Sequence, residues 1–245
     1  MRTLRLILAY DGTNYVGWQR QTNGLSIQQL VEDAFAPLMD GVAPSVAGAG
    51  RTDAGVHAAG QVASVNLDVD VPADAVQRAL NVRLPFEIRV LDVQDAPLGF
   101  HARFRARGKT YRYRVVSTPV LSPFDRLFVW HATEPRDLDR MRRAAAAFVG
   151  RHDFASFRGR GSAIEDTVRT VDRLDIHEQA DGFVVEIEGD GFLRHMTRII
   201  VGTLADVGTG LRTPESMRTV LEARDRREAG PTVPAAGLTL MSVRY

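Results

Sequence analysis

Hydrophobic and polar residues follow two periods along this chain. In some segments apolar side chains alternate with polar ones or form short β-branched runs, which is typical of strands. In others they recur every three to four positions, which is typical of helices with one buried face. The predicted strands are residues 3–9, 61–67, 88–93, 109–116, 168–177, 182–188 and 238–245. The predicted helices are 26–38, 72–83, 138–149 and 214–223, and residues 191–202 are predicted to open a further, long helix.

Local signals mark the ends of several of these elements. The side-chain oxygen of Ser26 can cap the first helix. Leu84-Pro85 ends the second, because the residue before a proline avoids the helical conformation. Ala180-Asp181-Gly182 is a hairpin signal between two predicted strands, and the basic, glycine-rich residues 154–162 predict a mobile loop.

Strands and helices occur twice, in halves of similar length. We therefore predict an α+β fold of two similar subdomains, each a mainly antiparallel sheet with packed helices. The expected boundaries are 1–118 for an N-terminal α+β subdomain that carries the loop around Asp53, and 119–245 for a C-terminal one. Together they would form one catalytic unit with a central basic cleft suited to a long polyanion.

Composition excludes several kinds of chemistry. The chain has no cysteine, which rules out disulfides, thiolate nucleophiles and cysteine zinc sites. The net charge of +1 predicts no partner, but every basic residue except Lys109 is an arginine. A GC-rich coding bias would explain this, yet arginine also suits forked contacts to phosphate. The short, charge-interrupted apolar run at the N-terminus is neither a signal peptide nor a membrane span, so a cytoplasmic location is expected.

The most informative stretch is 47–59, AGAGRTDAGVHAA. Glycines at this density let a backbone turn sharply and approach a ligand. Asp53 would be presented there as a carboxylate that is ionised at neutral pH, because a free Asp titrates at about 3.9 and a nearby Arg51 would favour the charged form. That suits a nucleophile or an electrostatic stabiliser. From this loop alone, a turn in which Asp53 caps a helix is the slightly better interpretation.

Residues 100–116, FHARFRARGKTYRYRVV, carry basic and aromatic side chains with no acid between them. Alternation from Lys109 onwards places Tyr111 and Tyr113 on one face and Arg112 and Arg114 on the other. This resembles an RNA-facing sheet. The alternative is a solvated basic edge strand, and the absence of acids favours the RNA-facing interpretation.

Two further segments have two interpretations each. Residues 15–21, YVGWQRQ, could line a groove for bases or be a loop anchored in the core by Trp18. In 191–202, Arg194 and Arg198 are four residues apart and would share a helical face. That face could hold an anion or be a surface basic stripe, and periodicity does not separate the two.

Other catalytic motifs do not occur in the sequence. We find no HExxH, no GxxxxGK[ST], no GxGxxG in 48–55 and no nucleophile elbow. A presented carboxylate without metal or cofactor suits chemistry at a glycosidic carbon. On RNA, the target base would have to leave its stack.

Six motifs together resemble the tRNA pseudouridine synthase A family, in the same order across nearly the whole chain. GRTDAGVHA is the most specific of them, and the likeness ends at Gly237-Leu238. The motifs are YDGTNYVGWQRQ (10–21), AGRTDAGVHAAGQV (49–62), FHARF (100–104), KTYRYRV (109–115), DFASF (153–157) and FLRHMTRIIVG (192–202).

The resemblance implies an isomerase that converts uridine to pseudouridine at positions 38–40 in the anticodon stem-loop of tRNAs. It implies a homodimer with tRNA bound across both subunits, without cofactor or metal. By the family's pattern Asp53 is the catalytic carboxylate, Tyr111 stacks against the target base and Arg198 pairs with Asp53. Ser64 departs from a histidine frequent in the family, which puts a secondary RNA contact in doubt. The expected substrate-binding residues are Arg51, Arg103, Lys109, Tyr111, Arg112, Arg194 and Leu238.

Two other functions compete with this one. A non-catalytic RNA-binding module would explain the basic strand but gives Asp53 no task. A metal-free glycosidase or nucleosidase would use Asp53, but no second carboxylate is obviously placed as its acid.

Overall fold

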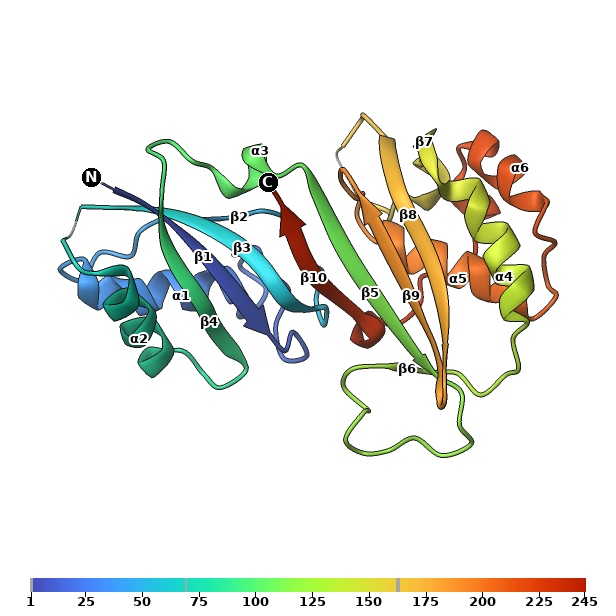
Figure 1. Ribbon diagram of the computed structural model, residues 1–245, viewed down its shortest axis with the longest axis horizontal. Helices are drawn as coiled ribbons and strands as arrows, with labels where there is room; N and C mark the ends of the chain where they lie inside the picture. The colour runs from blue at the N-terminus through green and yellow to red at the C-terminus, as the bar shows by residue number, and fades with distance from the viewer. Residues whose placement is uncertain (1, 69, 162–163) are drawn as a thin grey trace. The chain divides into compact units, whose positions relative to one another are not determined.

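The computed structural model describes residues 2–68, 70–161 and 164–245 (Figure 1). The chain divides into two compact units, Met1–Arg107 with Thr239–Tyr245, and Gly108–Leu238. These boundaries differ from the predicted 1–118 and 119–245. The difference arises because the C-terminal strand pairs with a strand of the first unit, and the basic strand after residue 107 belongs wholly to the second.

The first unit is built on an antiparallel sheet. Strand β1 (Arg2–Tyr10) lies between β3 (His57–Leu67) and β4 (Ile88–Ala96) and is antiparallel to both. The short β2 (Val46–Gly48) pairs antiparallel with β3, and β10 (Leu238–Arg244) joins β3 in parallel. Side chains on β1 alternate between buried and partly exposed from Leu4 onwards, as the apolar alternation predicts.

The helical elements among the described residues of this unit are α1 (Ile27–Phe35), the 3₁₀ turn η1 (Ala36–Leu38), α2 (Ala73–Arg83) and α3 (Ala102–Arg105). Ser26 caps α1 as predicted, since its side chain accepts a hydrogen bond from the Gln29 amide. Helix α2 ends before Leu84-Pro85, as predicted. The one-turn helix α3 lies in the basic stretch, where the sequence predicted no helix.

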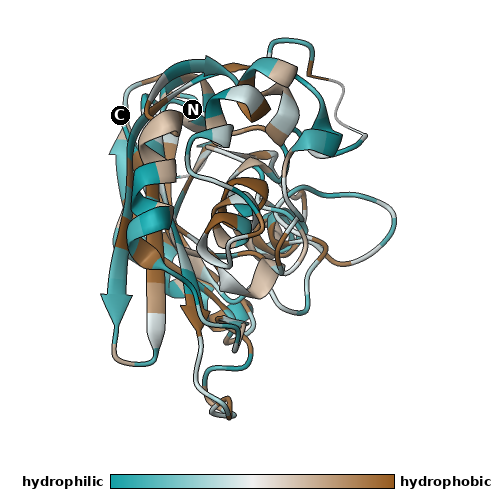
Figure 2. Ribbon diagram, turned by 90° about the vertical axis from the view of Figure 1, so that its right-hand side faces the viewer, coloured by the Kyte–Doolittle hydropathy of each residue, from teal (hydrophilic) through white to brown (hydrophobic). Residues whose placement is uncertain are grey.

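The second unit contributes antiparallel strands that pair in the order β5-β9-β8-β7. These strands are β5 (Gly108–Val116), β9 (Gly182–Gly189), β8 (Val168–Gln179) and β7 (Gly150–Asp153). The two-residue β6 (Trp130–His131) pairs in parallel with β5. The predicted hairpin is confirmed, because β8 and β9 are adjacent and antiparallel. Brown and teal segments follow one another along the strands in Figure 2.

Helix α5 (Met196–Gly208) is almost entirely buried, and α4 (Leu138–Ala145) packs against both α5 and β8. The other helical elements are η2 (Ala146–Phe148), η3 (Ala155–Phe157), α6 (Ser216–Ala223), η4 (Arg226–Glu228) and η5 (Ala235–Gly237). The prediction of a mobile loop at 154–162 is wrong for its first part, since Phe154, Ser156 and Phe157 are buried. Ser162, at the end of this range, lies outside the described residues.

The α+β class and the mainly antiparallel strand pairing are confirmed. No helix in the described part of the chain is long and apolar enough to cross a membrane.

Candidate functional site

Asp53 lies in the loop that connects β2 to β3. Its side chain is partly buried, Thr52 before it is buried and Arg51 is exposed. No helix follows this loop directly, because β3 begins at His57. The alternative in which Asp53 caps a helix is therefore wrong.

The loop is held on both sides by backbone hydrogen bonds. The Trp18 amide donates to the Thr52 carbonyl at 3.1 Å, and the Gly55 amide donates to the Tyr15 carbonyl at 3.4 Å. Within the loop, the Val56 amide donates to the Asp53 carbonyl at 3.1 Å. Buried backbone groups paired in this way fix the path of the chain, so the position of the Asp53 Cα is set by the segment that precedes α1.

Two glycines allow the segments to approach this closely. A Cβ on Gly17, whose φ is +100°, would lie 2.4 Å from the Thr52 carbonyl oxygen. A Cβ on Gly48 would lie 2.4 Å from Cε2 of Trp18. No side chain fits at such distances, so both positions require glycine for contact, and Gly17 requires it for its conformation as well.

A buried polar cluster lies under the loop. The Tyr10 hydroxyl and Thr52 Oγ1 are 2.8 Å apart, and Gln61 Nε2 donates to the Gly50 carbonyl at 2.9 Å. Burial raises the pKa of Tyr10 to about 12, so its phenol stays protonated at neutral pH. These bonds join β1 and β3 to the residues on either side of Arg51.

Residues 15–21 support the Asp53 loop. Trp18 is 2 % exposed, and its ring centroid lies 6.2 Å from that of Tyr10. The interpretation of 15–21 as a loop anchored by Trp18 is therefore confirmed. Gln19 Oε1 accepts a hydrogen bond from Arg51 Nε at 3.1 Å, so this segment also orients an expected substrate-binding arginine.

His57 fixes the turn that follows β1. Its Nδ1 lies 3.1 Å from both the Gly12 amide nitrogen and Asp11 Oδ1, and the ring is buried. Asp11 in turn accepts from the Thr13 amide at 2.9 Å. His57 therefore has a structural role, because it links the end of the Asp53 loop to the turn at residues 11–13.

In the second unit, Tyr111 is a buried residue of β5 that packs edge-on against Phe192. Their ring centroids are 5.1 Å apart and the planes meet at 82°. Tyr113, on the same face, is also buried and donates from its hydroxyl to the Pro234 carbonyl. The predicted alternation along β5 is confirmed, because Arg112 between them is exposed.

Arg198 lies in the first turn of α5 and is oriented by the segment before β10. Its Nε donates to the Val233 carbonyl at 2.7 Å. The next carbonyl in the chain, that of Pro234, accepts the hydrogen bond from the Tyr113 hydroxyl. Burial raises the pKa of Tyr113, while the positive charge of Arg198 opposes that rise. Leu238, at the start of β10, is buried. The structure thus brings Tyr111, Arg198 and Leu238 into the second unit, whereas Arg51 and Asp53 share one loop of the first.

Arg194 does not share a helical face with Arg198. Helix α5 begins at Met196, after His195 in a left-handed conformation with φ +60°. Arg194 is exposed in the preceding turn and donates to the Arg160 carbonyl at 3.0 Å. The prediction of a helix from residue 191 is wrong at this end, because a left-handed residue interrupts the helical backbone.

The arginines of β5 form ion pairs with carboxylates on neighbouring segments. Arg112 donates from Nε and Nη2 to Glu186 on β9, at 2.9 and 2.7 Å. Arg114 pairs with Asp125 and Asp181, both at 2.7 Å. Lys109 is partly buried at the start of the strand and Arg103 is exposed on α3. The β5 part of this run is therefore flanked by acids in space, although its own sequence contains none.

No group of three or more His, Asp or Glu side chains able to hold a metal ion occurs among residues 2–68, 70–161 and 164–245. The site residues supply carboxylate, guanidinium, phenol and amide groups. A carboxylate on a rigid loop can attack an electrophilic carbon or stabilise positive charge that develops on a sugar.

The chain is similar to known proteins over its whole length. A family model described as tRNA pseudouridine synthase matches residues 6–105 and 144–245. A tRNA pseudouridine synthase A of Syntrophotalea carbinolica is 49% identical over 245 residues, which is 100% of this chain and 97% of the relative. Proteins of the same name from Pelobacter propionicus and Geobacter sulfurreducens are 45% and 46% identical, each over 100% of both chains.

Proposed function

Because the chain belongs to the tRNA pseudouridine synthase family and isomerises uridine to pseudouridine in tRNA, we propose that Asp53 is its catalytic carboxylate and that it acts at positions 38–40 of the anticodon stem-loop. The observation that carries this proposal is the Asp53 loop, fixed by two neighbouring backbone contacts and presented from the first unit. A functional carboxylate needs such a rigid frame, because small misplacements of a reacting group lower rates steeply.

The reaction breaks the bond between uracil N1 and the ribose carbon and forms one from C5 to that same carbon. N1 gains a proton and C5 loses one, so no oxidant, reductant or external group is needed. A carboxylate can serve by attacking the sugar, by attacking the ring or by assisting an elimination, and all three routes require Asp53 to be ionised.

The other proposed roles belong to binding and orientation. Tyr111 offers an aromatic surface for the target base, and Arg198 would pair with Asp53 through its forked guanidinium. The Val233 carbonyl that binds Arg198 Nε supports this role, because it fixes the direction of the side chain. The substrate contacts proposed besides Tyr111 are Arg51, Arg103, Lys109, Arg112, Arg194 and Leu238. We also propose a cytoplasmic location, where the tRNA substrate is found.

The proposed target positions are tested with a tRNA transcript labelled with tritium at uracil C5. We expect tritium to be released, because forming the new carbon bond expels the C5 hydrogen. Sequence mapping of the product should find pseudouridine at positions 38, 39 and 40. A matched transcript with cytidine at these three positions should release none. Release at full rate from that transcript would place the reaction elsewhere in the tRNA.

A homodimer is also part of the proposal. Val120, Phe124 and Phe128 are exposed apolar side chains between β5 and β6 in the second unit, and grouped apolar exposure often marks an interface. Sedimentation equilibrium should therefore give about twice the chain mass of 27.0 kDa. A single-chain mass at micromolar concentration contradicts the dimer and leaves the assignment of Asp53 untouched.

A further inference from the structure

Helix α3 of the first unit and the residues just after it present aromatic and basic side chains, of which the proposed function uses only Arg103. Phe104 is 76% exposed, and Arg103, Arg105 and Arg107 around it are exposed as well. A phenyl ring held in water loses the favourable free energy of burial. An exposed apolar side chain with charged neighbours is typical of a binding surface.

The exposure of Phe104 does not come from a loose loop. Ala102, at the start of α3, is fully buried with Ala49 and Val62. Its amide donates to Ser64 Oγ at 3.0 Å, and its carbonyl accepts from the Tyr245 hydroxyl at 2.9 Å. The turn is therefore fixed from below while Phe104 points outward. At Ser64 the sequence put an RNA contact in doubt, and in the structure its hydroxyl accepts a hydrogen bond inside the protein.

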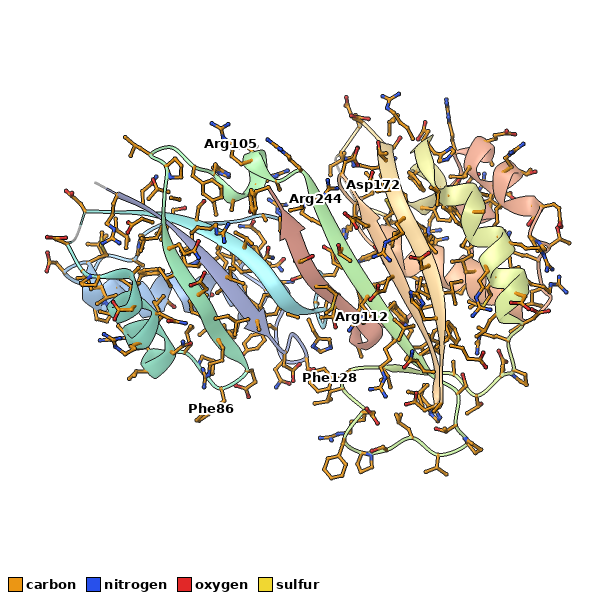
Figure 3. All side chains as sticks on the ribbon, viewed as in Figure 1. Phe86, Arg105, Arg112, Phe128, Asp172 and Arg244 are labelled. Carbon is orange, nitrogen blue, oxygen red and sulfur yellow. The ribbon has the colours of Figure 1, made fainter. Side chains whose placement is uncertain are left out.

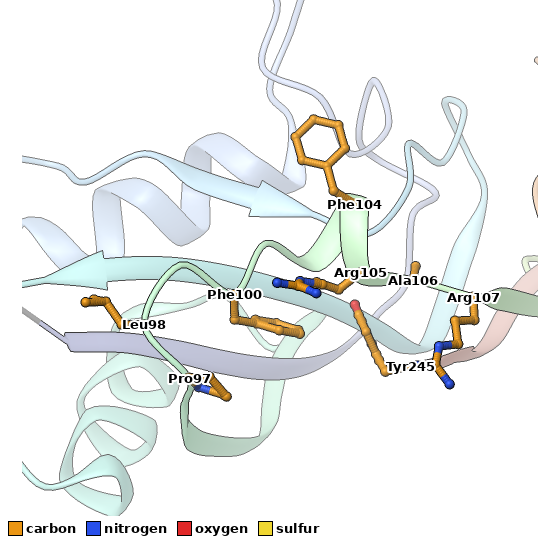
Figure 4. A pocket seen from close by; sticks show the side chains of 8 residues that line it. All are labelled: Pro97, Leu98, Phe100, Phe104, Arg105, Ala106, Arg107 and Tyr245. Atoms are coloured by element: carbon orange, nitrogen blue, oxygen red, sulfur yellow. The ribbon is translucent and has the colours of Figure 1, made fainter.

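A hollow of about 540 Å³ lies beside this turn (Figure 4). Its apolar side includes Leu98, Phe100 and Tyr245, and the last two rings are 5.2 Å apart. Phe104 also borders it, and the described residues that line it include no Asp or Glu. The volume lies within the range of small-molecule sites, which is about 300–1,000 Å³, so one planar base fits by size and by chemistry.

The arginines around the hollow differ from those of β5 in their ionic partners. Arg103, Arg105 and Arg107 form no ion pair within the part of the chain that the structure describes. By contrast, Arg112 on β5 of the second unit pairs with Glu186 on β9 of that same unit. Three guanidinium groups within five residues, none in an ion pair with a described residue, favour an anionic partner, and phosphates next to a base supply that charge.

We propose that α3 and this hollow form a subsite for an unpaired nucleotide of the tRNA other than the one that reacts. Its base stacks on Phe104 at the rim of the hollow, and its flanking phosphates contact Arg105 and Arg107. The proposal rests on the proposed function in that the RNA is the substrate tRNA. Ala49 supports a link to the catalytic loop, because it packs in the cluster beneath α3 and lies just before Arg51 in the chain.

Phe86 provides a matched control in the same unit. It is 92% exposed and projects from the protein at the turn before β4 (Figure 3). Arg89 lies 4.6 Å over its ring, but the Nη1 of that arginine donates to the carbonyls of Leu84, Pro85 and Ile88. This pair therefore resembles the proposed subsite in composition, while its cation already binds its own turn.

The test is direct binding of an unmodified tRNA transcript to the full chain at fixed salt. Phe104→Ala should raise the Kd by a factor of about 5 to 150, since stacking on one base contributes about 1–3 kcal/mol. Phe104→Trp should retain the affinity of the parent, and Phe104→Leu should resemble the alanine variant. Phe86→Ala should leave the Kd unchanged. Arg105→Gln should lower the slope of log Kd against log salt by about 0.7 to 0.9 for one lost phosphate contact.

An unchanged Kd for Phe104→Ala, or full affinity for Phe104→Leu, overturns the proposal. A lower sedimenting mass for Phe104→Ala with an unchanged Kd would also overturn it and would identify the surface as an interface between copies of the chain. Binding requires no turnover, so these results are independent of the catalytic assignment of Asp53. At saturating tRNA, Phe104→Ala should turn over at the parent rate, which separates a loss of binding from a loss of catalysis.

Discussion

The Asp53→Asn variant is expected to bind tRNA as the parent does and to form pseudouridine at least about 10⁴-fold more slowly, as for the loss of a central catalytic group in other enzymes. Asparagine keeps the size of the side chain and removes its charge. The backbone bonds of Thr52, Asp53 and Gly55 do not involve the carboxylate, so the loop should keep its path. The measurement is single-turnover tritium release, paired with direct tRNA binding.

Asp40→Asn is the matched control for this substitution. Asp40 is exposed in a turn of the same unit and has φ +50°, a conformation that asparagine tolerates well. The control removes one negative charge from the first unit without touching the loop, and its rate should equal that of the parent. If Asp53→Asn kept even a tenth of the parent rate, Asp53 would not be the catalytic carboxylate. An equal loss in Asp40→Asn would point to net charge instead.

The family resemblance and the isomerase activity were predicted from the sequence and are confirmed, so the RNA-binding module and the glycosidase are no longer competing explanations. The motif around Asp53 carried this prediction because its residue types are chemically specific. Positions 38–40 and the roles of Asp53, Tyr111 and Arg198 stay predictions, which the assays above test.

Elements with a clear period were predicted well. Strand β1, the capped start of α1 and the β8–β9 hairpin follow from alternation, an N-cap serine and a turn signal, all of which act within a few residues. The start of α5 was missed because His195 adopts a left-handed backbone that nothing in the local sequence demands. Helix α3 is too short to show a period at all.

Contacts between distant residues were not predictable from a linear pattern. The basic run of β5 contains no acid, yet the register of β5 with β9 places Glu186 opposite Arg112. Likewise, the aromatic and polar residues 15–21 gave no sign that their backbone would hold the Asp53 loop. Strand pairing and close packing decide both.

The Gly17→Ala variant is expected to have the second largest effect, although it alters no functional group. Its new Cβ would lie 2.4 Å from the Thr52 carbonyl oxygen and 2.9 Å from the Asp53 carbonyl carbon, so the two segments must separate. A displacement of about 1 Å at a reacting group can lower the rate by about 10²-fold. The single-turnover rate should fall by that factor, and thermal unfolding should show a lower Tm.

Gly41→Ala separates this close contact from backbone strain. Gly41 has φ +87° but no atom within 4 Å of an added Cβ, so alanine there meets only the left-handed conformation, at about 1–2 kcal/mol. That variant should lose this much stability and keep the parent rate. Gly17→Ala should lose more stability and most of its activity, because the clash falls on the loop that presents Asp53. If the two variants behaved alike, the path of the Asp53 loop would not depend on its contact with residue 17.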